Sequence, residues 1–184
     1  MQPHPRHHLG IFYLIAANGQ TAMVDAAAKY LSSDIHPVQV VWGYFLAISV
    51  LLGAHAVYTR FPVRQLLGAK HGWLQFVRAG LLVATIVTLF LALTVMPLAD
   101  AIAITFMAPL FIVLLAGPML GERIGLHRYA AVIVGLVGVA IIIRPGSGLA
   151  TWAVAMPLLS ALAFAFFQII TRQLASKAPT MVTL

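Results

Sequence analysis

Six long apolar stretches fill most of the 184-residue chain, at residues 9–31, 38–58, 73–96, 98–120, 124–143 and 149–171. A helix needs roughly 20 mostly apolar residues to cross about 30 Å of hydrocarbon. Only 8% of the residues are charged, whereas a soluble domain averages about 25%. Because the backbone inside a bilayer must satisfy its own hydrogen bonds, each stretch is predicted to be a helix. The predicted fold class is therefore an all-α integral membrane protein with about six transmembrane helices.

Basic side chains gather on one side of these stretches, and their distribution predicts the orientation of the chain. Two of them, Lys29 and Arg144, lie on the other side. The remaining nine are Arg6, Arg60, Arg64, Lys70, Arg78, Arg123, Arg128, Arg172 and Lys177. Because cytoplasmic loops are enriched in Lys and Arg, we expect a cytoplasmic N-terminal tail at residues 1–8, in a multi-pass protein of the inner or plasma membrane. The same loops account for the net charge of +7 without a nucleic-acid partner.

A series of short motifs follows the predicted helices in a specific order. They are Asp25-Ala26-Ala27-Ala28-Lys29-Tyr30, Arg78, Pro97-Leu98-Ala99-Asp100-Ala101, Ala108-Pro109-Leu110, Leu120-Gly121-Glu122-Arg123, Gly135-Leu136-Val137-Gly138 and Ile143-Arg144-Pro145-Gly146. Together these motifs resemble the EamA-type repeat of the drug/metabolite transporter superfamily. One departure lies after Trp42, where Gly43 and Tyr44 follow and many relatives carry an arginine.

The resemblance implies a domain organisation in repeats of five helices, with ten helices in a typical member. Residues 9–146 then form the first repeat, and residues 147–184 form the sixth helix and the start of a seventh, in an incomplete second repeat. A weak internal repetition agrees, because residues 29–33 and 172–176 are similar and each is followed by a proline, Pro37 or Pro179. An odd number of helices inverts the second copy in the membrane. We expect the chain to be a truncated part of a longer protein.

Ionisable side chains inside predicted helices are the first candidates for a substrate pathway, because charges are costly in lipid. Asp25 and Lys29 lie one helical turn apart and can pair, and Asp100 and Arg144 fall at the same outer side. These four residues predict an outer polar cluster beside the pathway. The alternative is a set of salt bridges that fastens the helix ends, with the basic side chains reaching the headgroups.

Further candidates for the substrate pathway lie elsewhere in the predicted helices. Arg78 could bind a carboxylate through its forked guanidinium, or it could simply mark the cytoplasmic side. Asn18 and Trp42 could line the pathway or form hydrogen bonds between helices. Pro109 could interrupt the fourth helix at the level of the substrate, as in other transporters, or only kink it.

A second group of residues is predicted to be structural or to act in gating. Glu122 and Arg123 form the turn between the fourth and fifth helices, where Gly121 can end one helix and Glu122 can bond the start of the next. Gly135 and Gly138 place small residues on one side of the fifth helix, which favours close packing.

The chain offers no signature of an enzyme. It has no cysteine and no phosphate-binding loop, nucleophile elbow or zinc motif, so we expect neither a cofactor nor a metal. The resemblance implies transmembrane transport of a small organic metabolite, amino-acid-like or nucleoside-like, by alternating access. The alternative is a non-transporting membrane subunit, or an inactive fragment that associates with a partner membrane protein. The expected partners are a small-molecule substrate, membrane lipids, and a second copy of the chain or a complementary second half.

Overall fold

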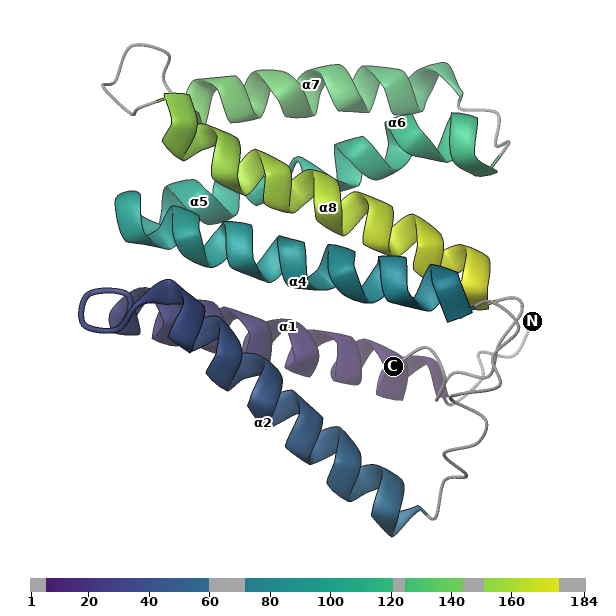
Figure 1. Ribbon diagram of the computed structural model, residues 1–184. Helices are drawn as coiled ribbons and strands as arrows, with labels where there is room; N and C mark the ends of the chain where they lie inside the picture. Colours follow the sequence, from purple (N-terminus) through teal and green to yellow (C-terminus); the bar gives the residue numbers. More distant parts are fainter. Residues whose placement is uncertain (1–5, 60–71, 121–124, 144–150, 176–184) are drawn as a thin grey trace.

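The computed structural model describes residues 6–59, 72–120, 125–143 and 151–175, and in these ranges all regular secondary structure is helical. The helices are α1 (Arg6–Leu31), α2 (Pro37–Tyr58), α4 (Gly72–Val95), α5 (Leu98–Thr105), α6 (Ala108–Leu120), α7 (Leu126–Ile143) and α8 (Thr151–Ala175) (Figure 1). The all-α prediction is confirmed. Five of the six predicted stretches form one helix each, and the fourth is divided between α5 and α6.

Four segments of the described residues are long and apolar enough to cross a membrane. They are Pro37–Tyr58, Gly72–Val95, Leu98–Leu120 and Trp152–Leu174. Helix α1 has 26 residues but is made more polar by Asn18, Asp25 and Lys29, and α7 holds a shorter apolar stretch. The chain is therefore a multi-pass membrane protein by composition, and the count of six spans stays a prediction.

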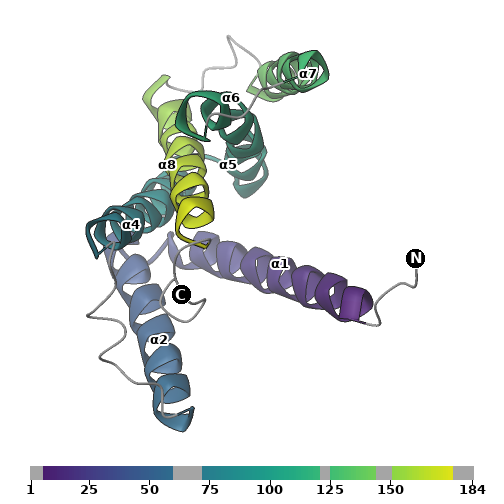
Figure 2. The same ribbon diagram turned by 90° about the vertical axis from the view of Figure 1, so that its right-hand side faces the viewer.

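The centre of the bundle is the antiparallel pair of α4 and α8. Helix α8 packs most extensively on α4, and next on α6 and α5 (Figures 1 and 2). Two contacts define the register: Arg78 lies over the ring of Phe167, and seven residues further along α4 the carbonyl of Thr85 accepts a hydrogen bond from Ser160. A seven-residue spacing on both helices is the geometry of helices that cross at a small angle.

Small side chains allow α4 and α8 to approach each other closely. Ala92 and Ala153 are 0% and 3% exposed and belong to one buried cluster. Ser160, Ala161 and Ala165 continue this buried face along α8. Without a hydrophobic effect between helices in lipid, such residues favour association because they permit close van der Waals contact.

The fourth predicted span is interrupted in its middle. Helix α5 ends at Thr105 and α6 begins at Ala108. Pro109 explains the break, because it has no N–H and its ring crowds the carbonyl four residues earlier, that of Thr105. The chain turns tightly here, and the N–H of Met107 donates to the carbonyl of Ile104 at 3.0 Å.

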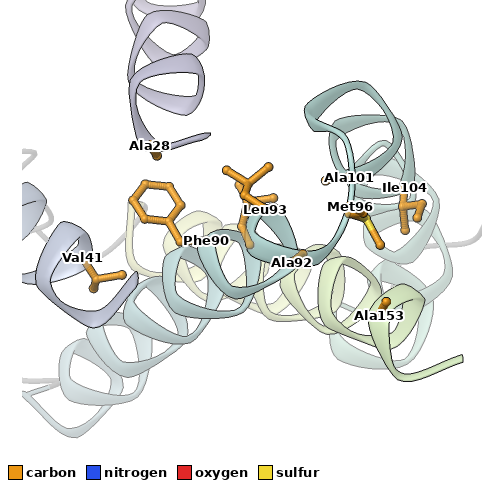
Figure 3. Packing of buried hydrophobic residues seen from close by; sticks show 10 residues of the cluster. Ala28, Val41, Phe90, Ala92, Leu93, Met96, Ala101, Ile104 and Ala153 are labelled. Atoms are coloured by element: carbon orange, nitrogen blue, oxygen red, sulfur yellow. The ribbon is translucent and has the colours of Figure 1, made fainter. Parts of the chain in front are cut away.

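The N-terminal helices join the bundle mainly at one end. Helices α1 and α2 diverge from that end (Figure 2). Ala28 of α1 and Val41 of α2 pack there beside Phe90 and Leu93 of α4 (Figure 3). This cluster continues to Met96 and into α5, so it holds the α1–α2 pair onto the hairpin that joins α4 to α5.

Candidate functional site

The most unusual side chain in the bundle is Arg78 of α4, a buried cation. It is 8% exposed, although it lies only about 9 Å along the axis from the start of α4 at the 1.5 Å rise of a helix. Its guanidinium carbon is 5.1 Å from the centroid of the Phe167 ring on α8. Within residues 6–59, 72–120, 125–143 and 151–175, it makes no ion pair and no hydrogen bond. The guanidinium is thus turned toward α8 rather than extended along the lipid-facing surface.

Two phenylalanines of α8 connect Arg78 to the break in the fourth span. The rings of Phe164 and Phe167 stack with centroids 5.9 Å apart and planes 25° apart. Phe164 also packs against the buried cluster of Met107, Ala108 and Ala161, in which α8 meets the junction of α5 and α6. A continuous row therefore runs from Arg78 over the two rings to the helix break beside Pro109, whose own side chain is exposed.

The row combines residues that the sequence singled out with residues that it did not. Arg78 and Pro109 were predicted to belong to a substrate pathway. The structure places Arg78 at one end of the row and the helix break beside Pro109 at the other, while the side chain of Pro109 itself is exposed. Phe164 and Phe167 were missed. Their spacing of three residues puts them on one face of a helix, but only the packing of α8 against α4 and α6 brings that face to Arg78.

Seven residues further along α4, which is about two helical turns, a polar contact ties α4 to α8. The hydroxyl of Ser160, 1% exposed, donates to the carbonyl of Thr85 at 2.9 Å. The hydroxyl of Thr85 donates to Leu81 in its own helix at 2.8 Å. Every side-chain polar atom of the described residues that is fully shielded from solvent has a partner, so this interface contains no unsatisfied hydroxyl.

At the other end of α4, the structure differs from the expected outer cluster. Lys29 donates to the carbonyls of Leu93 at 2.6 Å and Met96 at 3.1 Å. It does not pair with Asp25 one turn earlier, and in the described part of the chain neither Asp25 nor Asp100 takes part in an ion pair. The cause lies in Pro97. A helical carbonyl normally receives the N–H four residues later, and Pro97 has none to give to Leu93.

A groove opens between α1 and α2 at this same end. Its volume is about 570 Å³, and its walls are apolar and aromatic. The rings of Tyr44 and Phe90 lie edge to face here, with their centroids 6.3 Å apart. Trp42, predicted for the substrate pathway, lines this groove. Asn18 does not reach it and instead donates to the carbonyl of Leu14 in its own helix at 2.8 Å.

The two glycines predicted to favour packing of α7 occupy different surroundings. A Cβ atom at Gly135 would lie 2.8 Å from a methyl carbon of Leu110 on α6, whereas one at Gly138 would meet nothing within 4 Å. Glu122, Arg123 and Arg144 lie outside the described residues. Among the described residues, no group of three or more His, Asp or Glu side chains could hold a metal ion.

Comparison with known proteins shows the family of the chain. Residues 8–144 match the EamA-like transporter family. The chain is 34% identical over 123 residues to a riboflavin transporter of Rhizobium johnstonii, covering 67% of this chain and 37% of that protein. It is 25% identical over 168 residues to an S-adenosylmethionine uptake transporter of Rickettsia prowazekii, covering 91% of this chain and 56% of that protein.

A third relative is the pseudopaline exporter CntI of Pseudomonas aeruginosa, 28% identical over 174 residues, which cover 93% of this chain and 59% of that protein. The chain thus spans about half the length of these relatives. No solved structure gives a significant match. The family match covers most of the chain, including Arg78 and the break at Pro109, so this protein belongs to the EamA-like transporter family and is not an enzyme.

Proposed function

We propose that the chain moves a small organic metabolite across the membrane by alternating access, with the row from Arg78 to the helix break as part of the substrate pathway. The observation that supports this proposal best is the buried guanidinium of Arg78. Removing an ion from water costs several kcal/mol, and ionisable residues inside membrane helices usually mark pathways for substrates or ions. A structural role would be better served by an apolar residue of similar volume.

The break beside Pro109 supports the same pathway. An interrupted helix exposes backbone groups that a continuous helix would use internally, and transporters commonly place such breaks next to the substrate. Phe164 packs against this break, so a molecule that reaches Arg78 along the rings would also reach the end of α5. In this proposal the motion separates α4 from α8, and it would break the hydrogen bond of Ser160.

The names of the relatives supply the first compounds to test. Purified protein in liposomes would be assayed for uptake of labelled riboflavin and S-adenosylmethionine. Arg78→Gln is expected to lower uptake of a transported compound at least tenfold, and Arg78→Lys less strongly. The matched control is Arg172→Gln on the exposed part of α8, which should leave uptake within twofold. If Arg78→Gln is folded and transports as well as the unmodified chain, Arg78 is not in the pathway.

We also propose that the N-terminus is cytoplasmic and that α8 begins an inverted second repeat. The uneven distribution of Lys and Arg supports this orientation. Reporter fusions check it: a fusion after Asp34 should report the outer side, and a fusion after Thr59 the cytoplasm. The opposite pattern, or equal populations at both sites, would contradict the proposed orientation.

A further inference from the structure

We propose that Arg78 and Phe167 form a recognition site for a carboxylate, and that the transported molecule carries this carboxylate beside a flat apolar group. This inference rests on the proposed function, and it names the chemical class of the substrate. It starts from the geometry of the guanidinium, which lies over the ring of Phe167 at 5.1 Å, within the range of a cation–π contact.

The way in which Arg78 is held leaves its hydrogen-bonding edge unused. The guanidinium of Arg78 lies within cation–π range of the Phe167 ring, and it carries five N–H groups in a rigid, planar fork. None of them has an acceptor in the described ranges. A carboxylate can receive two parallel N–H bonds from such an edge. In this proposal Phe167 is a positioning residue that holds the guanidinium beside its ring and leaves the N–H groups available to a ligand.

Among the described residues, the charge balance of the helices points to an anion. Asp25 and Asp100 belong to the opposite end of the bundle, because Arg78 is about 26 Å from the end of α4 at 1.5 Å per residue. At this distance neither carboxylate can neutralise Arg78, since even a partly buried pair weakens steeply beyond a few ångströms. An anionic ligand would offset the cost of burying the guanidinium, whereas a cationic ligand would raise it.

The surface beside the guanidinium indicates the rest of the ligand. Phe164 and Phe167 are only half-buried, and they stack with planes 25° apart. Because both rings are partly exposed, they form an apolar platform beside the guanidinium on which a planar group can stack. A small inorganic anion would use the fork of Arg78 but not this platform.

A lipid phosphate is the other source of an oxyanion at this place. Arg78 is about 9 Å from the start of α4 at the helical rise, and a guanidinium fork also binds phosphate. The two sources differ in one measurable respect. Phosphatidylcholine also carries a phosphate but has no net charge, so we expect a substrate carboxylate to bind in its presence. A site for lipid phosphate would be occupied and blocked by a lipid with a net negative charge.

Binding of 2-naphthoate, a flat and fluorescent carboxylate, tests the proposal on the full chain in phosphatidylcholine nanodiscs. Its neutral isostere 2-naphthamide is the comparison. We expect naphthoate to bind at least tenfold more tightly than naphthamide. Arg78→Gln should remove this preference, and Arg78→Lys should lower the affinity for naphthoate at least fivefold. Phe167→Leu should also lower the affinity for naphthoate, but it should keep part of the preference over naphthamide. Arg172→Gln should change neither affinity.

Several outcomes would overturn the inference. Equal binding of the two probes, no binding of either, or an equal loss in Arg78→Gln and Arg172→Gln would each do so. Loss of naphthoate binding in phosphatidylglycerol nanodiscs would assign the site to a lipid phosphate. If Arg78→Gln does not fold, Arg78→Lys decides, since it keeps the charge without the fork. Binding is measured without transport. A chain that binds naphthoate selectively but transports nothing would therefore contradict the proposed function and leave the recognition site standing.

Discussion

The contact between Lys29 and the end of α4 gives a quantitative prediction. Lys29→Met keeps most of the apolar stem but removes the ammonium from the carbonyls of Leu93 and Met96, 2.6 and 3.1 Å away. A hydrogen bond to a charged group contributes about 1.5–3 kcal/mol, and a cation at a helix C-terminus adds about 0.3–1 kcal/mol. Since Lys29 is half-buried, we take the lower part of these ranges and expect Lys29→Met to lower the free energy of unfolding by about 2 kcal/mol.

The role of Pro97 in this contact can be measured with a double-mutant cycle. Pro97→Ala supplies the N–H that the carbonyl of Leu93 lacks. In this background Lys29→Met should lower the free energy of unfolding by about 1 kcal/mol less than in the unmodified chain, because the carbonyl of Leu93 then has a donor from its own chain segment. Unfolding in mixed detergent micelles gives the four free energies. Asn18→Leu is the control, since the amide of Asn18 bonds only its own helix.

A second assay reads the position of α1 directly. The chain contains no cysteine, so a cysteine introduced at Ala28, 4% exposed, is the only thiol. Maleimide should label it slowly while Lys29 holds α1 on α4, and at least fivefold faster in the Lys29→Met variant. The reasoning is refuted if Lys29→Met costs less than about 0.5 kcal/mol, or if its cost is the same with and without Pro97.

Two further predictions concern the packing of the bundle. Gly135→Ala should destabilise the protein by about 1 kcal/mol, because its Cβ would meet Leu110, whereas Gly138→Ala should be neutral or stabilising. Unfolding curves of the two variants test this difference, and equal effects would contradict the packing of α6 on α7. Ser160→Ala should lower the free energy of unfolding by about 0.6 kcal/mol, because it removes the hydrogen bond to the carbonyl of Thr85. An unfolding curve that shows a loss above about 2 kcal/mol would mean that the residue does more than donate this bond.

Much of the fold could be predicted because lipid limits the choices of the backbone. The length of the apolar stretches, the absence of an N–H at Pro97 and Pro109, and the small residues of α7 are local properties of the chain. They predicted the helices, and they left open whether Pro109 interrupts the fourth span or only kinks it. The pairing of Asp25 with Lys29 was also a local inference, whereas the structure has Lys29 donating to two carbonyls at the end of α4. Proline had left a carbonyl of α4 without a donor, and that carbonyl lies 64 residues from Lys29 in the chain.

The sequence alone thus determined the solvent of this protein, its helices and the family to which it belongs, since these depend on composition and on the order of residues along each segment. Only the tertiary structure decided which faces meet. Arg78 looks the same in sequence whether it extends to the headgroups or turns into the bundle. The antiparallel packing of α8 on α4 places Phe167 beneath it and Phe164 against the helix break. Side-chain partners far apart in the chain are set by packing geometry, which the apolar pattern of a single helix does not record.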